Sequence, residues 1–115
     1  MKSDREAIQE LTAIYAGAID RKDYAAIPGC FALNSAVIYA GYSEELIGHA
    51  AIVDHMRLAL DPLDVTQHMF ANFVIDIDGD TATMACDILA QHVRDGETYM
   101  AGGKYDVRLA RIDQT

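Results

Sequence analysis

Residues 66–93, TQHMFANFVIDIDGDTATMACDILAQHV, predict a long β-hairpin around which the rest of the chain is organised. Asp78 and Gly79 mark its turn, because an Asp-Gly pair tolerates the positive φ angles that tight hairpins require. The second strand alternates between apolar and polar residues, which indicates that one of its faces is buried. The apolar set is Ala82, Met84, Cys86, Ile88 and Ala90, and His92 falls in phase with it.

The first strand of this hairpin changes phase part-way along its length. An extra residue in one strand of an antiparallel pair shifts every later side chain to the other face. We therefore predict a single β-bulge near Asn72, which would place two apolar sets on one face. Before Asn72 the set is His68 and Phe70, and after it the set is Phe73, Ile75 and Ile77.

Length, composition and charge limit the classes of protein that this chain can belong to. We expect one domain over residues 1–115, because 115 residues with 51% hydrophobic content can bury a core without disulfides or metals. The net charge of −9 argues against a nucleic-acid partner, since phosphate binding needs clustered Lys and Arg. Cys30 and Cys86 have no CxxC partner and are expected to be reduced core residues. We expect a cytoplasmic protein, because no signal peptide or membrane-spanning segment is visible.

The remaining elements follow from periodicity and from capping and turn residues. A first helix should begin after a cap at Ser3 or Asp4 and end near Asp20. The other expected elements are a short helix over 24–27 that Pro28 ends, a strand over 36–40 with a turn at Gly41, a short strand over 46–48, a helix over 49–60, and a third long strand over 99–111. This order predicts an α+β fold, in which three helices from the N-terminal half pack on a mainly antiparallel sheet.

Five polar side chains are candidates for one cavity between the first helix and the sheet. A histidine such as His68 can remove a proton, and a carboxylate such as Asp20 can orient its ring and stabilise its charged form. A tyrosine hydroxyl can then stabilise an oxyanion. The candidates are Asp20, His68, His92, Tyr15 and one of Tyr39, Tyr42 or Tyr99. The structural alternatives stay open here, because an Asp at a helix end is often a solvated cap and a strand histidine or helix tyrosine is often core.

Metal sites and nucleotide loops are weaker interpretations of the same residues. Asp76, Asp78 and Asp80 have the spacing of a calcium loop, but Thr81 occupies the position that needs glycine. A set of two histidines and one carboxylate from His68, His92 and Asp20 is conceivable as a metal site. Gly102-Gly103 has no GxGxxG pattern around it. We predict no metal and no cofactor.

Most of the chain resembles the SnoaL-like branch of the nuclear-transport-factor-2-like superfamily, which has a cone-shaped α+β fold. Within it, the chain looks most like the group of scytalone dehydratase and hexachlorocyclohexane dehydrochlorinase. The matching segments are YAGAIDRKDY, Phe31, AVIYA, IGHAAIVDHM, TQHMFANFVIDIDGDTA, the strand with His92, and YMAGGKYDVRL.

The resemblance implies a cofactor-free β-elimination or isomerisation of a small apolar, cyclic molecule. It assigns His68 as base, Asp20 as its orienter, and His92 with a tyrosine as groups that polarise an oxygen. We expect Tyr15, Tyr39, Phe70, Asn72 and Tyr99 to contact the substrate. A ketosteroid isomerase mechanism is disfavoured, because AVIYA lacks the acid.

Other functions of this fold stay open. They are polyketide cyclisation, binding of a small ligand without turnover, and dimerisation. The family's last strand has no counterpart before Thr115, so we expect an exposed sheet edge, or one that a neighbouring subunit covers. We expect a homodimer through the outer face of the sheet.

Overall fold

The computed structural model describes residues 1–39 and 44–112, and its architecture is α+β as predicted. Within these residues the elements are α1 (Asp4–Asp20), the 3-10 helix η1 (Ile27–Cys30), β1 (Ala36–Val37), β2 (Leu46–Ile47), α2 (Gly48–Leu60), β3 (Val65–Asp78), β4 (Thr81–Arg94) and β5 (Glu97–Ala110). No helix in this part of the chain is both long enough and apolar enough to span a membrane.

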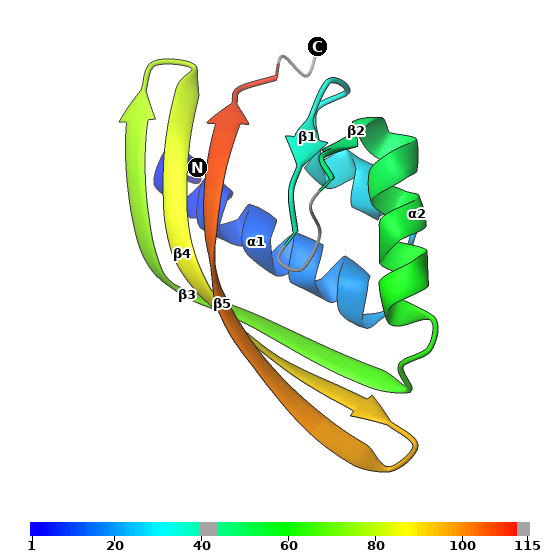
Figure 1. Cartoon of the computed structure of the whole chain (residues 1–115). Helices are drawn as coiled ribbons and strands as arrows, with labels where there is room; N and C mark the ends of the chain where they lie inside the picture. The colour runs from blue at the N-terminus through cyan, green and yellow to red at the C-terminus, as the bar shows by residue number, and fades with distance from the viewer. Residues whose placement is uncertain (40–43, 113–115) are drawn as a thin grey trace.

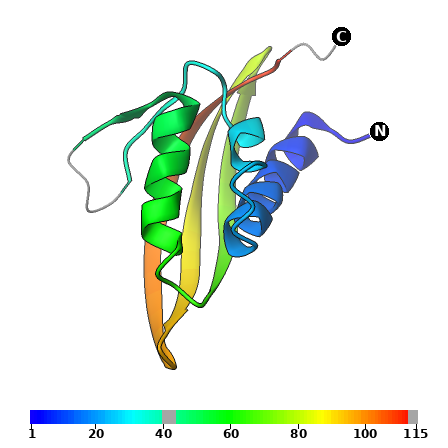
Figure 2. The same cartoon turned by 90° about the vertical axis from the view of Figure 1, so that its right-hand side faces the viewer.

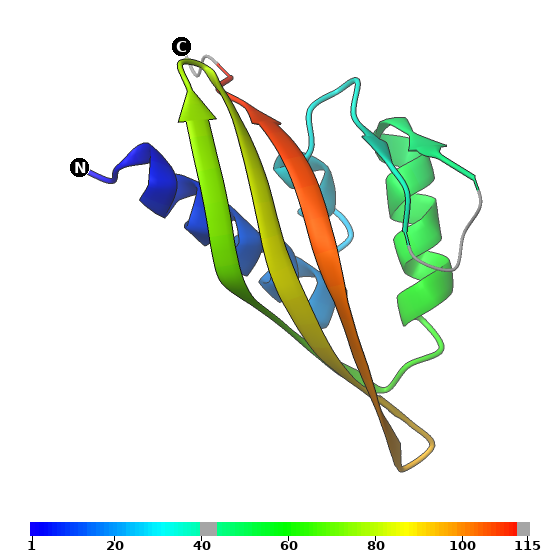
Figure 3. The ribbon, with the colours of Figure 1, turned by 60° about the vertical axis from the view of Figure 1, so that its left-hand side comes forward.

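The three long strands form one antiparallel sheet in the order β3-β4-β5. The sheet bends strongly, and α1 and α2 lie on its concave side (Figure 1, Figure 2). Figure 3 views the sheet from the convex side, with α1 behind the strands and α2 to the right of β5. β1 and β2 pair with each other as a separate antiparallel ribbon beside α2 (Figure 1). This arrangement leaves the concave face as the place where helices, sheet and ribbon can enclose a site.

Helix α1 starts with a capping box at Ser3, as the sequence predicts. The Ser3 hydroxyl accepts a hydrogen bond from the Glu6 backbone N–H at 3.1 Å, and the Glu6 carboxylate accepts one from the Ser3 N–H at 3.4 Å. These contacts satisfy N–H groups that have no partner inside the helix. The helix buries Tyr15, Ala18 and Ile19, and it ends at Asp20. Its length therefore places Asp20 beside the start of β3.

Two expected elements differ in the structure. The helix expected over 24–27 is replaced by turns followed by η1, in which Pro28 lies near the first position. Proline is tolerated there because its missing N–H has no partner in a first turn, and it disfavours α-helix in the residue before it. Of the described residues of the strand expected over 36–40, Ala36–Val37 form a strand and Ile38 and Tyr39 do not, and Ala40 lies outside the described residues. The turn expected at Gly41 and the candidate Tyr42 lie outside the described residues.

The hairpin contains the predicted bulge at Asn72. Strand pairing jumps from Ala71 opposite Asp87 to Val74 opposite Ala85, and Asn72 has a φ of 56°. The prediction of a bulge that restores the apolar phase is therefore confirmed.

The turn of the hairpin lies one residue later than expected. A two-residue loop of Gly79 and Asp80 joins β3 to β4, and Gly79 takes a φ of 60°.

The hydrophobic core lies between the helices and the concave face of the sheet. Its larger cluster joins α1, η1 and α2, and consists of Tyr15, Ala18, Ile19, Ile27, Ile52, Met56 and Leu60. Its smaller cluster, Ile75, Met84 and Cys86, lies on β3 and β4. Phe70 and Tyr105 pack against both clusters. The space around these two aromatic rings is where the candidate site is found.

Candidate active site

Asp20 and His68 are in direct contact where the end of α1 meets the start of β3. His68 Nδ1 lies 2.7 Å from Asp20 Oδ1, and the His68 backbone N–H donates to Asp20 Oδ2 at 3.0 Å. The Thr66 hydroxyl also donates to Asp20 Oδ1, at 2.9 Å. The carboxylate can only accept from the ring, so Nδ1 carries the hydrogen and Nε2 is left as the free acceptor.

The surroundings of this pair are largely dry. The side chain of His68 is 11% exposed and that of Asp20 is 23% exposed, and Thr66 is buried. Electrostatic interactions are stronger where water is excluded, because the effective dielectric constant is lower. Asp20 is therefore well placed to stabilise a positive charge that forms on His68.

His92 lies on β4 next to this pair. It is opposite Thr66 in the strand pairing, and its ring centroid is 5.5 Å from that of His68. Burial lowers the pKa of His92 below 6.5, and the neighbouring His68 lowers it further, while Asp20 acts in the opposite direction. The lowered pKa favours the neutral ring of His92 near pH 7, and the neutral ring has one N–H that can donate a hydrogen bond.

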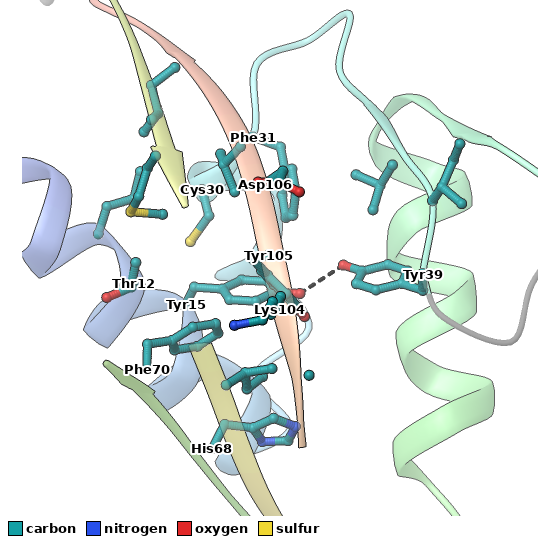
Figure 4. Close-up of a pocket in the computed structure, with 18 of the residues that line it drawn as sticks. Thr12, Tyr15, Cys30, Phe31, Tyr39, His68, Phe70, Lys104, Tyr105 and Asp106 are labelled. Atoms are coloured by element: carbon teal, nitrogen blue, oxygen red, sulfur yellow. Dashed lines mark hydrogen bonds between the residues drawn. The ribbon is translucent and has the colours of Figure 1, made fainter. Parts of the chain in front are cut away.

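Two tyrosines form a second polar group in the same cavity. The hydroxyls of Tyr15, on α1, and Tyr39, after β1, are 2.7 Å apart (Figure 4). Burial raises the pKa of both hydroxyls above its ordinary value, and for Tyr15 the neighbouring Tyr105 and Tyr39 act in the same direction. Both groups therefore stay protonated near neutral pH and can act as hydrogen-bond donors.

The ring of Tyr39 is held in place by His55 of α2. The two rings are stacked, with centroids 4.9 Å apart and planes inclined by 6°. On the other side of the pair, the Tyr15 ring makes an edge contact with Phe31 at 5.7 Å. Packing on both rings restricts their rotation, so the position of the hydroxyl pair is well defined.

These groups surround a cavity of about 500 Å³. α1, the segment from η1 to Tyr39, and the concave face of β3, β4 and β5 form its sides (Figure 4). Aliphatic and aromatic side chains predominate, and the lining also includes the polar residues Thr12 and Ser35 and the charged residues Lys104, Asp106 and Arg108 of β5. The lining includes Ile8, Leu11, Tyr15, Phe31, Val37, Tyr39, His68, Phe70, Met84, Ile88, Ala90, His92, Gly103, Tyr105 and Val107. Such a cavity suits a small apolar molecule with one or two polar atoms.

Most of the site residues that the sequence indicated come together here. Tyr15, Tyr39, His68, Phe70 and His92 all line the cavity. Asp20 lies behind His68 and contacts the cavity only through that ring, since its carboxylate accepts from His68 and Thr66. Asp20 and His68 therefore form a hydrogen-bonded pair at the wall of the cavity.

Asn72 and Tyr99, which we expected to contact the substrate, lie outside the cavity. The Asn72 amide donates to Asp87 Oδ2 at 2.8 Å in an exposed contact on the convex face of the sheet. The bulge causes this, because it rotates the Asn72 side chain away from the face that carries His68. Tyr99 is 53% exposed, and its hydroxyl donates to Glu97 at 2.7 Å.

Tyr105 lines the cavity but was missing from the expected set. Its ring makes an edge contact with Phe70, at 5.3 Å between centroids, and burial raises the pKa of its hydroxyl. The signal was present in the sequence, because Tyr105, Val107 and Leu109 alternate with polar residues. Their pairing with β4, with Tyr105 opposite Cys86, puts this set on the concave face.

The described residues contain no group of three or more His, Cys, Asp or Glu side chains arranged to hold a metal ion. His68, His92 and Asp20 are neighbours, but Asp20 directs both of its oxygens to the hydrogen-bond donors of His68 and Thr66. Asp20 is hydrogen-bonded to His68 and Thr66, and His92 is next to His68 through a ring contact.

Sequence comparison points to one protein family. The model of a family described as the SnoaL-like domain matches residues 2–115. None of the curated proteins is significantly similar to the chain.

Several solved structures share the fold. One from Novosphingobium aromaticivorans, provisionally named an aromatic ring hydroxylase, has a TM-score of 0.86 and 28% identity, over 96% of this chain and 80% of that one. A second from the same organism, provisionally named a scytalone dehydratase, has a TM-score of 0.87 and 20% identity, over 96% and 75%. A third, from Streptomyces avermitilis, is provisionally named a dehydratase of the NTF2-like family, with a TM-score of 0.81 and 15% identity over 94% and 86%.

Proposed function

Because this chain belongs to the SnoaL-like domain family, whose model spans residues 2–115, we propose that it is a small lyase or isomerase of the dehydratase type. Its substrate is a small cyclic molecule with a carbonyl group and a leaving group β to it. The observation that carries the proposal is the 2.7 Å contact between Asp20 Oδ1 and His68 Nδ1 beside an apolar cavity. The names of two structural neighbours, provisionally given as dehydratases, support the same reaction type.

The first step is removal of a proton from the carbon next to the carbonyl. Nε2 of His68 is the acceptor, because Nδ1 donates to Asp20. The imidazolium that forms is stabilised by the Asp20 carboxylate, which the Thr66 hydroxyl holds in place. Positioned general bases of this kind contribute about a hundredfold to ten-thousandfold in rate.

The electron pair from the broken C–H bond moves to the carbonyl oxygen as an enolate. Tyr15 and Tyr39 suit this oxygen, because only one of two mutually hydrogen-bonded hydroxyls uses its hydrogen within the pair. The other hydroxyl can donate to the substrate. Their raised pKa values keep both hydroxyls protonated, and their packed rings hold them ready before the charge forms.

In the second step the enolate returns its electron pair and the bond to the leaving group breaks. A neutral His92 can donate its ring N–H to the departing oxygen. The proton that His68 accepted goes to that oxygen, so hydroxide leaves as water and the dyad regains its initial state. If the proton returns instead to another carbon of the same molecule, the reaction is an isomerisation.

Binding of a small ligand without turnover is the second candidate. The observation in its favour is the open side of the cavity at β5, where Ala101 and Gly103 line the cavity and are exposed. Water that enters there weakens electrostatic stabilisation of a transition state. A binder needs the cavity alone, whereas the enzyme also needs the contact between Asp20 and His68.

The test uses 3-hydroxy-1-tetralone, a cyclic β-hydroxyketone that loses water to give 1-naphthol, which absorbance or fluorescence detects. We expect turnover by the native protein and a loss of about a hundredfold or more in kcat for Asp20→Asn. Asp87→Asn is the matched control, because Asp87 is an exposed carboxylate on the other face of the sheet.

Tyr15→Phe should also lower kcat, whereas Tyr24→Phe should not, because the Tyr24 hydroxyl donates to Asp61 away from the cavity. Equal rates for native protein and Asp20→Asn would contradict the mechanism. Binding of the probe by native protein without any 1-naphthol would support the ligand-binding alternative.

A further inference from the structure

The concave face of β5 carries very small side chains at the level of the dyad. Across the sheet, His68 is opposite Ala90, which is opposite Ala101. In the next row, Phe70 is opposite Ile88, which is opposite Gly103. A space lined by Ala90, Ala101 and Gly103 therefore lies beside His68, and all three residues line the cavity.

Neither the backbone nor the packing of the protein requires glycine at position 103. Its φ lies outside the left-handed region, unlike that of Gly79 or Gly96. A Cβ atom built on Gly103 would meet Ile88 Cγ2 at 3.6 Å, which is an ordinary van der Waals contact. Glycine within a strand weakens the strand and removes a side chain that could pack. The empty volume above Gly103 is therefore not explained by the fold.

We infer that Gly103 is a specificity-determining position, because its missing side chain leaves room for the ring of a bound cyclic molecule against β5. The inference rests on the proposed function, since it concerns the same cavity. The ring would lie over Gly103 and Ala101, with its reacting atoms toward His68 and His92. Adjacent strands are about 4.8 Å apart, so β5 lies two strand spacings across the sheet from β3 and its histidine.

The neighbouring Gly102 provides a matched control. Two successive glycines can also serve to let a strand bend, and β5 is strongly curved (Figure 1). Gly102 also lines the cavity. It is opposite Leu89, however, so a side chain added there would point to the convex face, whereas one added at Gly103 would point into the cavity. If the glycines serve the curvature of β5, substitution of either one should have a similar effect. If the space is needed for a ligand, substitution of Gly103 alone should weaken binding.

The experiment compares Gly103→Val with Gly102→Val in the full chain. Binding of 2-naphthol is followed by its fluorescence, turnover of 3-hydroxy-1-tetralone by 1-naphthol formation, and folding by thermal unfolding. We expect Gly103→Val to unfold no earlier than the native protein and to bind 2-naphthol about tenfold more weakly or worse, because the two added methyl groups overfill the space. Gly102→Val should bind as the native protein does. Gly103→Ala, which adds one carbon, should give an intermediate affinity.

Equal affinity of native protein and Gly103→Val would overturn the inference, as would equal losses in both valine variants. If Gly103→Val fails to fold, Gly103→Ala and Ala101→Val decide: the inference requires both to weaken binding while remaining folded. The proposed function can fail separately. Selective loss of 2-naphthol binding in Gly103→Val, without turnover by the native protein, would support the inference and reject the enzyme. Turnover by the native protein that is unchanged in Gly103→Val would support the proposed enzyme and reject the inference about Gly103.

Discussion

At the scale of single residues, the proposed mechanism assigns proton abstraction and stabilisation of the enolate oxygen to two separate groups of side chains. His68 lies at one part of the cavity and the hydroxyls of Tyr15 and Tyr39 lie in another (Figure 4). His92 lies next to His68. A substrate with its acidic carbon next to a carbonyl presents the two matching groups. Each protein group is held by neighbours, with Asp20 behind His68 and His55 stacked on Tyr39.

Lowered pKa values at His92 and His55 predict that stability falls with acidification. Burial lowers the pKa of both side chains below 6.5. As the pH falls below 6.5, the unfolded chain therefore takes up protons before the folded protein does, and the folded state loses stability. We expect the free energy of unfolding in urea to be lower at pH 5.5 than at pH 7.5, and the difference to shrink in His92→Gln.

The acidic groups titrate in a different range and can be separated from this effect. Hydrogen bonds lower the pKa values of Asp4 and Asp87, through Arg111 and Asn72 respectively as the largest causes, so their contribution is lost only below about pH 4. A difference between pH 5.5 and pH 7.5 that is the same in His92→Gln and in the native protein would show that His92 contributes nothing to it.

At the scale of elements, the bulge in β3 decides which side chains face the site. Before it, His68 and Phe70 lie on the concave face, and after it Ile75 does, although the spacing from Phe70 to Ile75 is odd. Without the extra residue, the apolar side chains of one end of β3, either the end with His68 or the end with Ile75, would point outward. The bulge lets one strand serve both the site and the core.

The bulge should depend on a residue that accepts a positive φ. Asn72 has a φ of 56°, and a β-branched residue there is strained, so Asn72→Val should lower the free energy of unfolding by about 1–3 kcal/mol. Gln67→Val is the control, because Gln67 is exposed in the regular part of β3. Urea unfolding measures both variants.

A third variant separates strain from the lost side-chain contact. Asn72→Gly accepts the positive φ but loses the hydrogen bond to Asp87. It should therefore be more stable than Asn72→Val. If Asn72→Val and Gln67→Val are equally stable, the conformation at position 72 does not limit stability.

At the scale of the whole molecule, the helices cover only the concave face of the sheet (Figure 2, Figure 3). The convex face carries exposed apolar side chains from all three strands, namely Met69, Val74, Leu89 and Met100. Exposed apolar groups gathered on one face are typical of surfaces that meet a partner. We propose that two copies of the chain associate through this face.

Association through the convex face predicts a specific effect of charge. Leu89→Lys should shift the native dimer toward monomer, because a lysine at the centre of the interface must be desolvated. Ile14→Lys is the control, since Ile14 is an exposed apolar residue on α1, at 53% exposure against 43% for Leu89. Light scattering after size-exclusion chromatography gives the mass of each variant. A native protein that is monomeric, or a dimer that Leu89→Lys leaves intact, would reject this interface.

Much of the fold was predictable because it depends on local signals. Alternation in β4, the glycine at the β3–β4 turn and the cap at Ser3 act within a few residues of sequence, and each is found in the structure. The broken phase of β3 was enough to predict its bulge. The short helix was placed wrongly because Pro28 disfavours the α-helical conformation in the residue before it, and it is tolerated near the start of the 3-10 helix that begins at Ile27.

In the candidate site, too, local sequence signals explain some features and long-range contacts explain the others. The sequence by itself determined the chemistry that is available: an acid at the end of a helix, histidines in an apolar phase, and tyrosines on apolar stripes. Only the tertiary structure decided which of these meet, because 48 residues separate Asp20 from His68 and no periodicity reports a contact at that distance. The register of β5 places Tyr105 in the cavity. The bulge keeps Asn72 out of it, because the side chain of a bulge residue turns with its backbone.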